Sequence, residues 1–571
     1  MNPVSPLLAA DSMPEVGFGA ILALGVFVIA SVWISMLANY ATRSGSFMKS
    51  FFLGNRGLGS WALALTATVQ SGGTFMGFPS YVYAHGWVVA LWICGYMVVP
   101  ITGFGILGKR LAQISRMTGA ITVPDLFRAR FHSPALGLIA SLLIMFFMTT
   151  MMIAQFKAGA IVMKLSFPGS GSLTLAEDAA TQIDYAYFVG LAVFSLTVIG
   201  YTLLGGFLAA VWTDLFQSVM MWFGILFLLF LAVSATGGPE IATRTIMENP
   251  NIGPAYALAP GFNSNAAFPG NEFLPLGLAA SMFGLWVFTG LGSPAGMVRI
   301  MACKDTGTIR RSIYLLAIYN AGIYLPLVVI CVCGRALLPD VAKSDEIIPR
   351  LAIHLTSGLP AGSFLAGLIL AAPFGAVMAT VSSYLVVISS GLVRDIYQRF
   401  INPHANEYQL ARLSYWVMGV VGLIAVLANI SPPKFLQVIV VFSGSGAGAS
   451  FMVPALMLAF WRRSTVPGMI AGMLVGGGTV VSLYFVEIFR GLALATLGGL
   501  ASSFYGMFPA QQIGPAQAMR AYYLFGIDPL IWGLLTSLIA GVTVSLLTKP
   551  LPDEVTARFF EDQTEPVASP A

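Results

Sequence analysis

Long apolar segments alternate with short polar ones along nearly all of the 571-residue chain. A helix needs about 20 apolar residues to cross ~30 Å of hydrocarbon. Strands of a membrane barrel would instead alternate apolar and polar residues. The pattern predicts an all-α, polytopic membrane protein with one transmembrane domain over residues 1–571 and thirteen spanning helices, near 17–40, 59–83, 87–108, 134–163, 182–203, 206–236, 273–296, 312–336, 361–393, 408–430, 434–460, 465–488 and 525–548.

The composition agrees with this pattern, because 57% of the residues are hydrophobic and only 9% are charged. Soluble proteins carry about 25% charged residues. Asp11 and Glu15 precede the first apolar segment where a signal peptide would have basic residues, so we expect a retained helix. Most of the 28 Lys and Arg residues fall in the loops on one side. That bias predicts an N-terminus outside the cell membrane, with the tail at 549–571 in the cytoplasm.

The remaining chemistry argues against an enzyme. The four cysteines, at 94, 303, 331 and 333, lie in or beside apolar segments without the spacing of a metal site. The four histidines are scattered, and no nucleophile-and-base motif is present. The net charge of +5 follows the loop asymmetry, so it indicates neither a nucleic-acid partner nor an obligate protein partner.

The second apolar segment is interrupted at its midpoint by "TVQSGGTFMG", residues 68–77. Two adjacent glycines each lower helix propensity by about 1 kcal/mol, and Gln70, Ser71 and Thr74 offer groups that satisfy an unwound backbone. Discontinuous helices of this kind mark binding sites in transporters. Close helix packing is the alternative, because small residues also let backbones approach.

The ninth segment places hydroxyls on one helical face. Ala379, Ser382 and Ser383 stand at i, i+3 and i+4, and Ser389 and Ser390 follow about two turns later. Neutral hydroxyls with a free carbonyl suit an alkali cation, whereas calcium and magnesium require carboxylates. Serines in such helices also serve packing alone.

Two ionisable residues lie within apolar segments. Asp214, in "GGFLAAVWTDLFQ", is a candidate cation or proton site, or a partner for an arginine from a loop. Lys157, in "IAQFKAGA", either extends to the outer interface or meets the carboxylate of a solute.

Five blocks in order carry a family resemblance: the segment around "FFLGNRGLGSWALALTATVQSGGTFMGFPSYVYAHG", then "ILGKRLAQISRMTGAITVPDLFRARF", "GGFLAAVWTDLFQ", "GSPAGMVRIMACKDTGTIRRSIY" and "SSGLVRDIYQRF". They resemble the sodium:solute symporter family, and "GRALLPD" and "FLAGLILAAPFGAVMAT" look closest to its pantothenate and monocarboxylate branches. The resemblance implies a leucine-transporter-type fold with inverted repeats of five helices each, at 59–236 and 273–460. The segments 17–40, 465–488 and 525–548 would be peripheral helices. The seventh segment, "SMFGLWVFTGLGSPAG", is also rich in glycine at the corresponding place.

The resemblance also implies a sodium site between the second and ninth helices, formed by Ala67, Gln70, Ala379, Ser382 and Ser383. Some members of the family hold a second sodium with the residue that matches Asp214 and two further hydroxyls. Leu385 and Val386 stand at those two positions here, so the second site lacks its partners.

We expect sodium-coupled import of a small organic solute by alternating access, with a carboxylate such as pantothenate or a monocarboxylate as the solute. A neutral solute such as proline or a sugar is the alternative, and a channel or a membrane sensor is a further one. No function is assigned to the loop at 489–524. The expected solute contacts are Ser71, Gly72, Thr74, Trp92, Tyr96, Gln155, Lys157 and Trp286.

Overall fold

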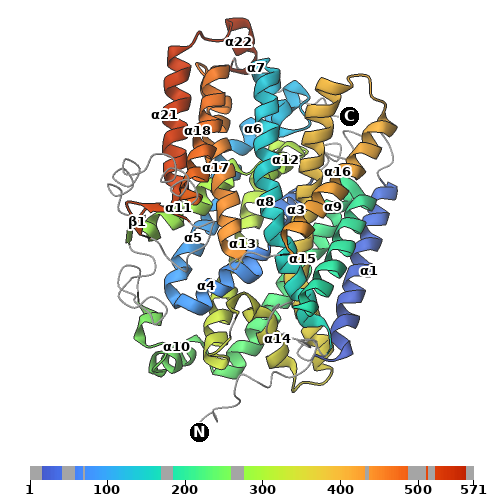
Figure 1. Cartoon of the computed structure of the whole chain (residues 1–571), viewed down its shortest axis with the longest axis vertical. Helices are drawn as coiled ribbons and strands as arrows, with labels where there is room; N and C mark the ends of the chain where they lie inside the picture. The colour runs from blue at the N-terminus through green and yellow to red at the C-terminus, as the bar shows by residue number, and fades with distance from the viewer. Residues whose placement is uncertain are drawn as a thin grey trace, which may run out of the picture.

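The structure is a computed structural model that describes residues 16–41, 58–67, 71–168, 184–258, 276–341, 343–430, 436–486, 510–511 and 521–560. Almost all of these residues are helical, and the longer helices stand side by side in one bundle (Figure 1). The first half contains α1 (Phe18–Ala41), α3 (Ser60–Ala67), η2 (Gly73–Gly77), α4 (Phe78–His85), η3 (Gly86–Val89), α5 (Ala90–Val99), η4 (Pro100–Gly108), α6 (Lys109–Thr118), α7 (Val123–Phe131), α8 (Pro134–Ser166), α9 (Tyr185–Thr236), α10 (Pro239–Glu248) and η5 (Pro254–Ala257).

The second half contains α11 (Leu276–Gly292), α12 (Pro294–Met301), α13 (Thr306–Leu337), η6 (Ser344–Glu346), α14 (Ile347–Thr356), α15 (Gly362–Ser390), η7 (Gly391–Ile401), α16 (Glu407–Ala428), α17 (Leu436–Phe460), α18 (Val466–Tyr484), α21 (Pro529–Leu547) and α22 (Asp553–Phe560). Strands β1 (Ala510–Gln511) and β2 (Tyr523–Leu524) pair in antiparallel fashion, and both lie within the expected loop at 489–524, for which no function was assigned.

The described residues contain eleven helices that are long and apolar enough to cross a membrane, or twelve if the bent pair α11–α12 is one span. The expected number of thirteen is therefore approximate. One run, Gly73–Thr118, includes parts of the second and third expected spans. From residue 185 on, the fifth and sixth expected spans lie within helix α9.

Helix ends follow local sequence signals. The hydroxyl of Thr122 accepts a hydrogen bond from the backbone N–H of Asp125 at 3.0 Å and so begins α7. Asp305 begins α13 in the same way, through the N–H of Thr308 at 2.6 Å. Such caps satisfy backbone donors that the first turn of a helix leaves free. Short polar loops can therefore stop one span and start the next.

The two glycine-rich spans are each described in separate helices. Helix α3 is described to Ala67, Ser71 is not helical, and helical geometry is present from Gly72, with a π-helical stretch from Gly73. Residues 68–70 lie outside the described residues, so the break at the paired glycines remains a prediction. Helices α11 and α12 meet at a 43° bend, where Ser293 caps α12 and Pro294 occupies its first turn. Proline without a backbone N–H fits a helix start and not a helix interior.

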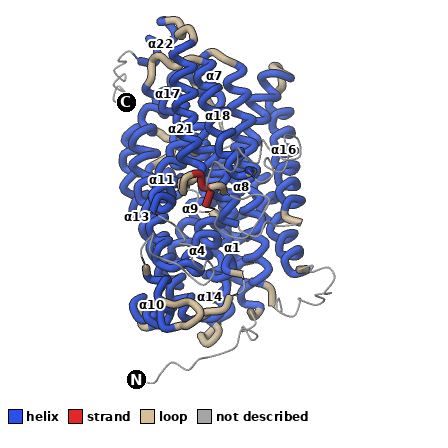
Figure 2. The backbone as a smooth tube through the Cα atoms, turned by 60° about the vertical axis from the view of Figure 1, so that its left-hand side comes forward, coloured by secondary structure: helices blue, strands red, loops and turns tan. Residues whose placement is uncertain are grey.

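Helices α15 and α17 form the buried centre of the bundle, and most of their side chains are buried. Helix α15 packs against α1, α8 and α9, whereas α17 packs against α8, α11, α18 and α21. Figure 2 shows the surrounding helices from a second side. Helices α10 and α14 lie at one end of the bundle, here named the α14 end. Helices α7 and α22 lie at the opposite end, named the α22 end.

Candidate functional site

The broken second span is held by contacts from helix α8. The side-chain oxygen of Gln155 accepts a hydrogen bond from the backbone N–H of Gly72 at 2.8 Å, and Ser71 Oγ accepts one from Gly73 N–H at 3.2 Å. A Cβ atom on Gly72 would lie 2.5 Å from the Cβ of Ala158. Gly72 is therefore closely packed against α8, which was the alternative explanation of the glycines, and it is also hydrogen-bonded to Gln155.

Aromatic rings from three helices gather beside this break. Thr74 Oγ1 lies 3.1 Å from the hydroxyl of Tyr324, whose ring stacks on that of Tyr96 at 4.3 Å between centroids. The Tyr96 ring lies 4.5 Å from that of Trp286, which stacks at 6.1 Å on Trp92. Four of the expected solute contacts therefore meet in one cluster, together with Tyr324, which the sequence analysis did not single out.

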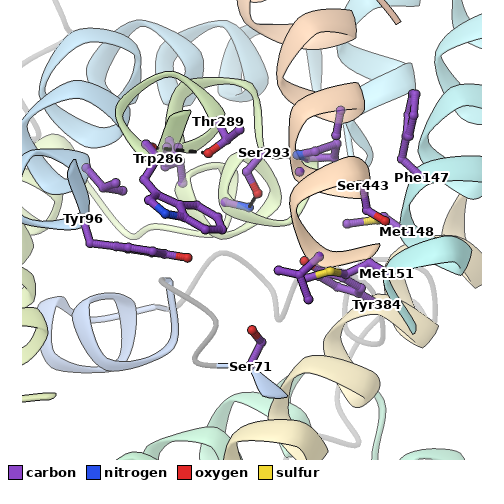
Figure 3. A pocket seen from close by; sticks show the side chains of 18 of the residues that line it. Ser71, Tyr96, Phe147, Met148, Met151, Trp286, Thr289, Ser293, Tyr384 and Ser443 are labelled. Carbon is purple, nitrogen blue, oxygen red and sulfur yellow. Dashed lines mark hydrogen bonds between the residues drawn. The ribbon is translucent and has the colours of Figure 1, made fainter. Parts of the chain in front are cut away.

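A cavity of about 140 Å³ lies next to these rings (Figure 3). Ser71, Tyr96 and Trp286 line it, and a much smaller void beside it also contacts Thr74 and Trp92. None of the described residues that line the main cavity has a charged side chain. Gly72, Gln155 and Lys157 line neither space. The sequence analysis missed the other residues with hydroxyl, thioether or aromatic side chains in the lining, namely Phe104, Phe147, Met148, Met151, Thr289, Ser293, Tyr384 and Ser443.

The expected sodium ligands of α15 share one buried face. Ala379 is 5% exposed, Ser382 is fully buried and Ser383 is 7% exposed. The hydroxyl of Ser382 donates to the carbonyl of Ala379 at 3.1 Å, and α15 contacts η2 directly. The side chain of Ala67 and the whole of Gln70 lie outside the described residues. The three α15 residues thus share a buried face, and the sodium site itself remains a prediction.

Asp214 forms a buried ion pair with Arg299 of α12. Arg299 Nη2 donates to Asp214 Oδ2 at 2.7 Å and to Ser383 Oγ at 2.7 Å, while the Ser383 hydroxyl lies 3.4 Å from the same carboxylate oxygen. The side chains of Arg299 and Asp214 are 4% and 3% exposed. Pairing with an arginine was one alternative for Asp214, although Arg299 belongs to a helix and not to a loop.

Lys157 is buried, so the expectation that it extends to the outer interface is wrong. Its Nζ atom lies 2.9 Å from Asp345 Oδ2 in the short helix η6, and both side chains are 9% exposed. A buried ammonium needs a counter-charge because hydrocarbon solvates it poorly. The contact of Lys157 with a solute stays a prediction.

A second polar network ties α7 to η7 at the α22 end. The hydroxyl of Thr122 donates to both carboxylate oxygens of Asp395, at 2.8 and 2.9 Å. Arg399 donates to Asp125 at 3.0 Å, and Arg394 approaches the same carboxylate at 3.5 Å. These contacts join the loop after the third span to the end of the α15 helix.

Helix α22 covers the same loop through an aromatic cage. The guanidinium carbon of Arg130 lies 5.1, 4.9 and 5.1 Å from the rings of Phe131, Phe559 and Phe560. Burial, and then the charge of Arg110, lowers the pKa of Arg130 to about 10. The electron-rich ring faces attract this cation and partly offset its lost hydration.

Sequence reasoning missed Arg299, Asp345 and Tyr324. Arg299 stands in the quoted block "GSPAGMVRIMACKD", and a lone arginine between apolar residues was the signal for it. Asp345 falls between two expected spans, at 312–336 and 361–393, where a carboxylate gives no such signal.

The sodium:solute symporter family model matches residues 51–476, which include both walls of the candidate site. This chain belongs to the sodium:solute symporter family. The family couples solute transport to sodium in the membrane, and the expected co-transported ion is therefore sodium.

Curated members of the family cover most of the chain. The sodium/pantothenate symporter of Haemophilus influenzae is 30% identical over 474 residues, which are 81% of this chain and 90% of that protein. The sodium/pantothenate symporter of Escherichia coli K12 is 30% identical over 463 residues, which are 80% of this chain and 89% of that one. The sodium/proline symporter of the same bacterium is 26% identical and covers 85% of this chain and 93% of its own length.

A solved symporter structure shares the fold. It is that of a sodium-coupled sialic acid symporter in a substrate-bound, outward-open state, with a TM-score of 0.65 and 19% identity. The match covers 94% of this chain and 99% of the other. This likeness confirms the all-α transporter fold, while the residue limits of the two repeats remain predictions.

Proposed function

We propose that this sodium:solute symporter imports a small organic carboxylate of the pantothenate or monocarboxylate type. The observation that carries the proposal is the 30% identity with two sodium/pantothenate symporters over four fifths of the chain. The cavity lining supports a solute with an apolar body and several polar groups, because aromatic and methionine side chains alternate there with hydroxyls.

Among the described residues that line the cavity, the carboxylate of such a solute has no cationic partner. The N–H groups of Gly72 and Gly73 already donate to Gln155 and Ser71, so the co-transported sodium is the positive group that we propose for the carboxylate. We therefore orient the carboxylate toward Ser71 and the sodium site, and the apolar part toward Trp286 and Met151.

A neutral solute is the second candidate. The uncharged lining and the neutralisation of Lys157 by Asp345 favour it, and sodium/proline symporters are among the relatives. A neutral amino acid or a sugar would use the same hydroxyls without needing a counter-charge.

We further propose that one sodium ion accompanies each solute, bound by backbone oxygens of Ala67 and Gln70 and by Ala379, Ser382 and Ser383. Arg299 already balances the charge of Asp214, and Leu385 and Val386 supply no oxygen ligand from their side chains. A second sodium at Asp214 would have to compete with a guanidinium at 2.7 Å.

The stoichiometry sets the driving force. One charge moved across 100 mV is worth ~2.3 kcal/mol, and a tenfold sodium gradient adds ~1.4 kcal/mol. Co-transport of one sodium with a neutral solute is driven by both the membrane potential and the sodium gradient. Co-transport of one sodium with a monoanion is electroneutral and is driven by the sodium gradient alone. Transport current therefore distinguishes the two candidates.

The proposed mechanism is alternating access. Sodium bound between η2 and α15 would order the helix break and favour solute binding beside it. Ion pairs at the two ends of the bundle would then open and close in turn. From the Lys and Arg bias of the loops we assign the α22 end, with the C-terminal tail, to the cytoplasm and the α14 end to the outside.

The test is uptake by the purified protein in proteoliposomes, with sodium or potassium as the only cation. Solutes would be chosen by a thermal-shift screen of small carboxylates, amino acids and sugars. The expected result is stabilisation by a carboxylate in sodium but not in potassium, followed by saturable uptake and counterflow. A sodium current that no solute changes would instead identify a channel. Solute binding without transport would identify a sensor.

A further inference from the structure

The ion pair between Lys157 and Asp345 joins two parts of the fold that each contact η2, the helical stretch at Gly73–Gly77. Lys157 belongs to the long helix α8, and Asp345 belongs to η6, in the segment that connects α13 to α15 at the α14 end. Their charged atoms lie 2.9 Å apart, and each side chain is 9% exposed. The pair is therefore largely removed from water.

The segment around Asp345 lies against the helix that contains the break. Helices η6 and α14 both contact η2 and α4. The hydroxyl of Tyr83, on α4, donates to the carbonyl of Leu338 at 2.6 Å and accepts from the N–H of Val341 at 3.0 Å. The chain leading to η6 is thus hydrogen-bonded to α4 through Tyr83, and η6 itself is joined to α8 through Asp345.

The α8 side of the ion pair is connected to the solute site. Gln155 stands two residues before Lys157 and accepts the hydrogen bond of Gly72 N–H at the break. The neighbouring carboxylate, Glu346, is already bound by Arg350 at 2.7 Å within its own helix turn. Asp345 is accordingly the acidic side chain of η6 that crosses to α8.

We propose that Asp345 is a gating residue, whose ion pair with Lys157 closes the solute site at the α14 end. Opening on that side moves η6 and α14 away from η2, and this movement must separate the two charges. A dry ion pair resists separation, whereas a hydrated pair contributes little. The segment η6–α14 therefore has two stable arrangements, as a gate requires. In one, the ion pair is formed and shielded from water, and in the other, the two charges are separated and hydrated.

This inference rests on the proposed transport function, and its test is independent of the solute. Thr74 at the solute site would be replaced by cysteine in a chain whose four native cysteines are alanine. A membrane-impermeant thiol reagent would then be applied to vesicles of either orientation. With Asp345→Asn, we expect labelling from the α14 side to become about tenfold faster or more.

Charge exchange separates gating from folding. Lys157→Asp combined with Asp345→Lys should return the labelling rate toward that of the parent. Glu240→Gln is the control, because Glu240 pairs with Arg244 at 3.2 Å within one turn of the exposed helix α10, at the same end of the bundle. Equal labelling of the parent and Asp345→Asn, an equal increase with Glu240→Gln, or failure of the exchanged pair to restore the rate would overturn the proposal.

Uptake kinetics give a second measurement. Loss of the gate favours the open state that binds solute, so Asp345→Asn should lower both KM and the maximal rate. A merely structural defect reduces the amount of active protein and lowers the maximal rate at constant KM. If the parent transports no solute with sodium, the proposed function fails by itself. If the parent transports solute and Asp345→Asn has the same KM and maximal rate as the parent, the gating proposal is contradicted.

Discussion

Arg299 reaches two groups with one nitrogen, since its Nη2 atom lies 2.7 Å from Asp214 Oδ2 and 2.7 Å from Ser383 Oγ. The expected sodium ligand Ser383 is therefore connected to a buried ion pair. A hydroxyl oxygen has two lone pairs, so one remains for sodium after the arginine N–H is accepted. The Asp214–Arg299 ion pair therefore orients the Ser383 hydroxyl and leaves one of its lone pairs for sodium.

The sodium site is tested by replacing its hydroxyls. Ser382→Ala with Ser383→Ala should raise the sodium concentration for half-maximal uptake about tenfold or more, because two oxygen ligands are lost. The measurement is uptake against sodium concentration. Ser390→Ala is the control, since its hydroxyl donates only to Val387 of the same helix. An unchanged sodium dependence at normal protein abundance would remove this site.

The Asp214–Arg299 pair is tested for its effect on stability and stoichiometry. Arg299→Met leaves a buried carboxylate unpaired, which typically costs about 3–5 kcal/mol. We expect a lower unfolding temperature for Arg299→Met and recovery when Asp214→Asn is added. A Hill coefficient for sodium near that of the parent in the double variant supports one sodium. A fall in the coefficient on removing Asp214 would indicate that Asp214 binds a second ion.

Gly72 is tested as a packing position. Gly72→Ala brings a Cβ atom to 2.5 Å from Ala158 Cβ. Overpacking of this kind costs about 1–3 kcal/mol and should also strain the Gln155 contact. Ala158→Gly in the same chain should restore both thermal stability and uptake. Failure of this rescue would show that the glycine serves some purpose other than approach to α8.

Lys157 is tested for recognition of carboxylates. Lys157→Met alone leaves Asp345 buried without a partner, so we expect destabilisation of about 3–5 kcal/mol. Lys157→Met with Asp345→Asn removes both charges and isolates the solute effect. If Lys157 meets the solute, this double variant should lose carboxylate uptake and keep that of neutral solutes. Equal effects on both solute classes would exclude the contact.

The aromatic cage of Arg130 is tested through α22. Phe559→Leu with Phe560→Leu keeps most of the apolar area but removes two ring faces, each worth about 0.5–2 kcal/mol to the cation. We expect earlier proteolytic loss of the C-terminal segment and a lower unfolding temperature. Phe525→Leu serves as the control, because the Phe525 ring is exposed and lies tilted against Trp532, 6.1 Å away. Identical behaviour of the two variants would contradict a role for the cage.

Local patterns were enough to predict several parts of this molecule. Apolar length marked the spans, because the length of a span depends on residues close together in the chain. The i, i+3, i+4 spacing placed Ala379, Ser382 and Ser383 on one face for the same reason. Family membership, first indicated by five ordered blocks, is confirmed by the match over residues 51–476.

The sequence by itself therefore determined the membrane class, the helices and the polar positions within them. Only the tertiary structure decided which partner each buried charge takes. Asp345 is 188 residues from Lys157, and Arg299 is 85 from Asp214. A buried charge requires a counter-charge wherever the fold can bring one, and periodicity along one helix holds no information about a group that another helix supplies.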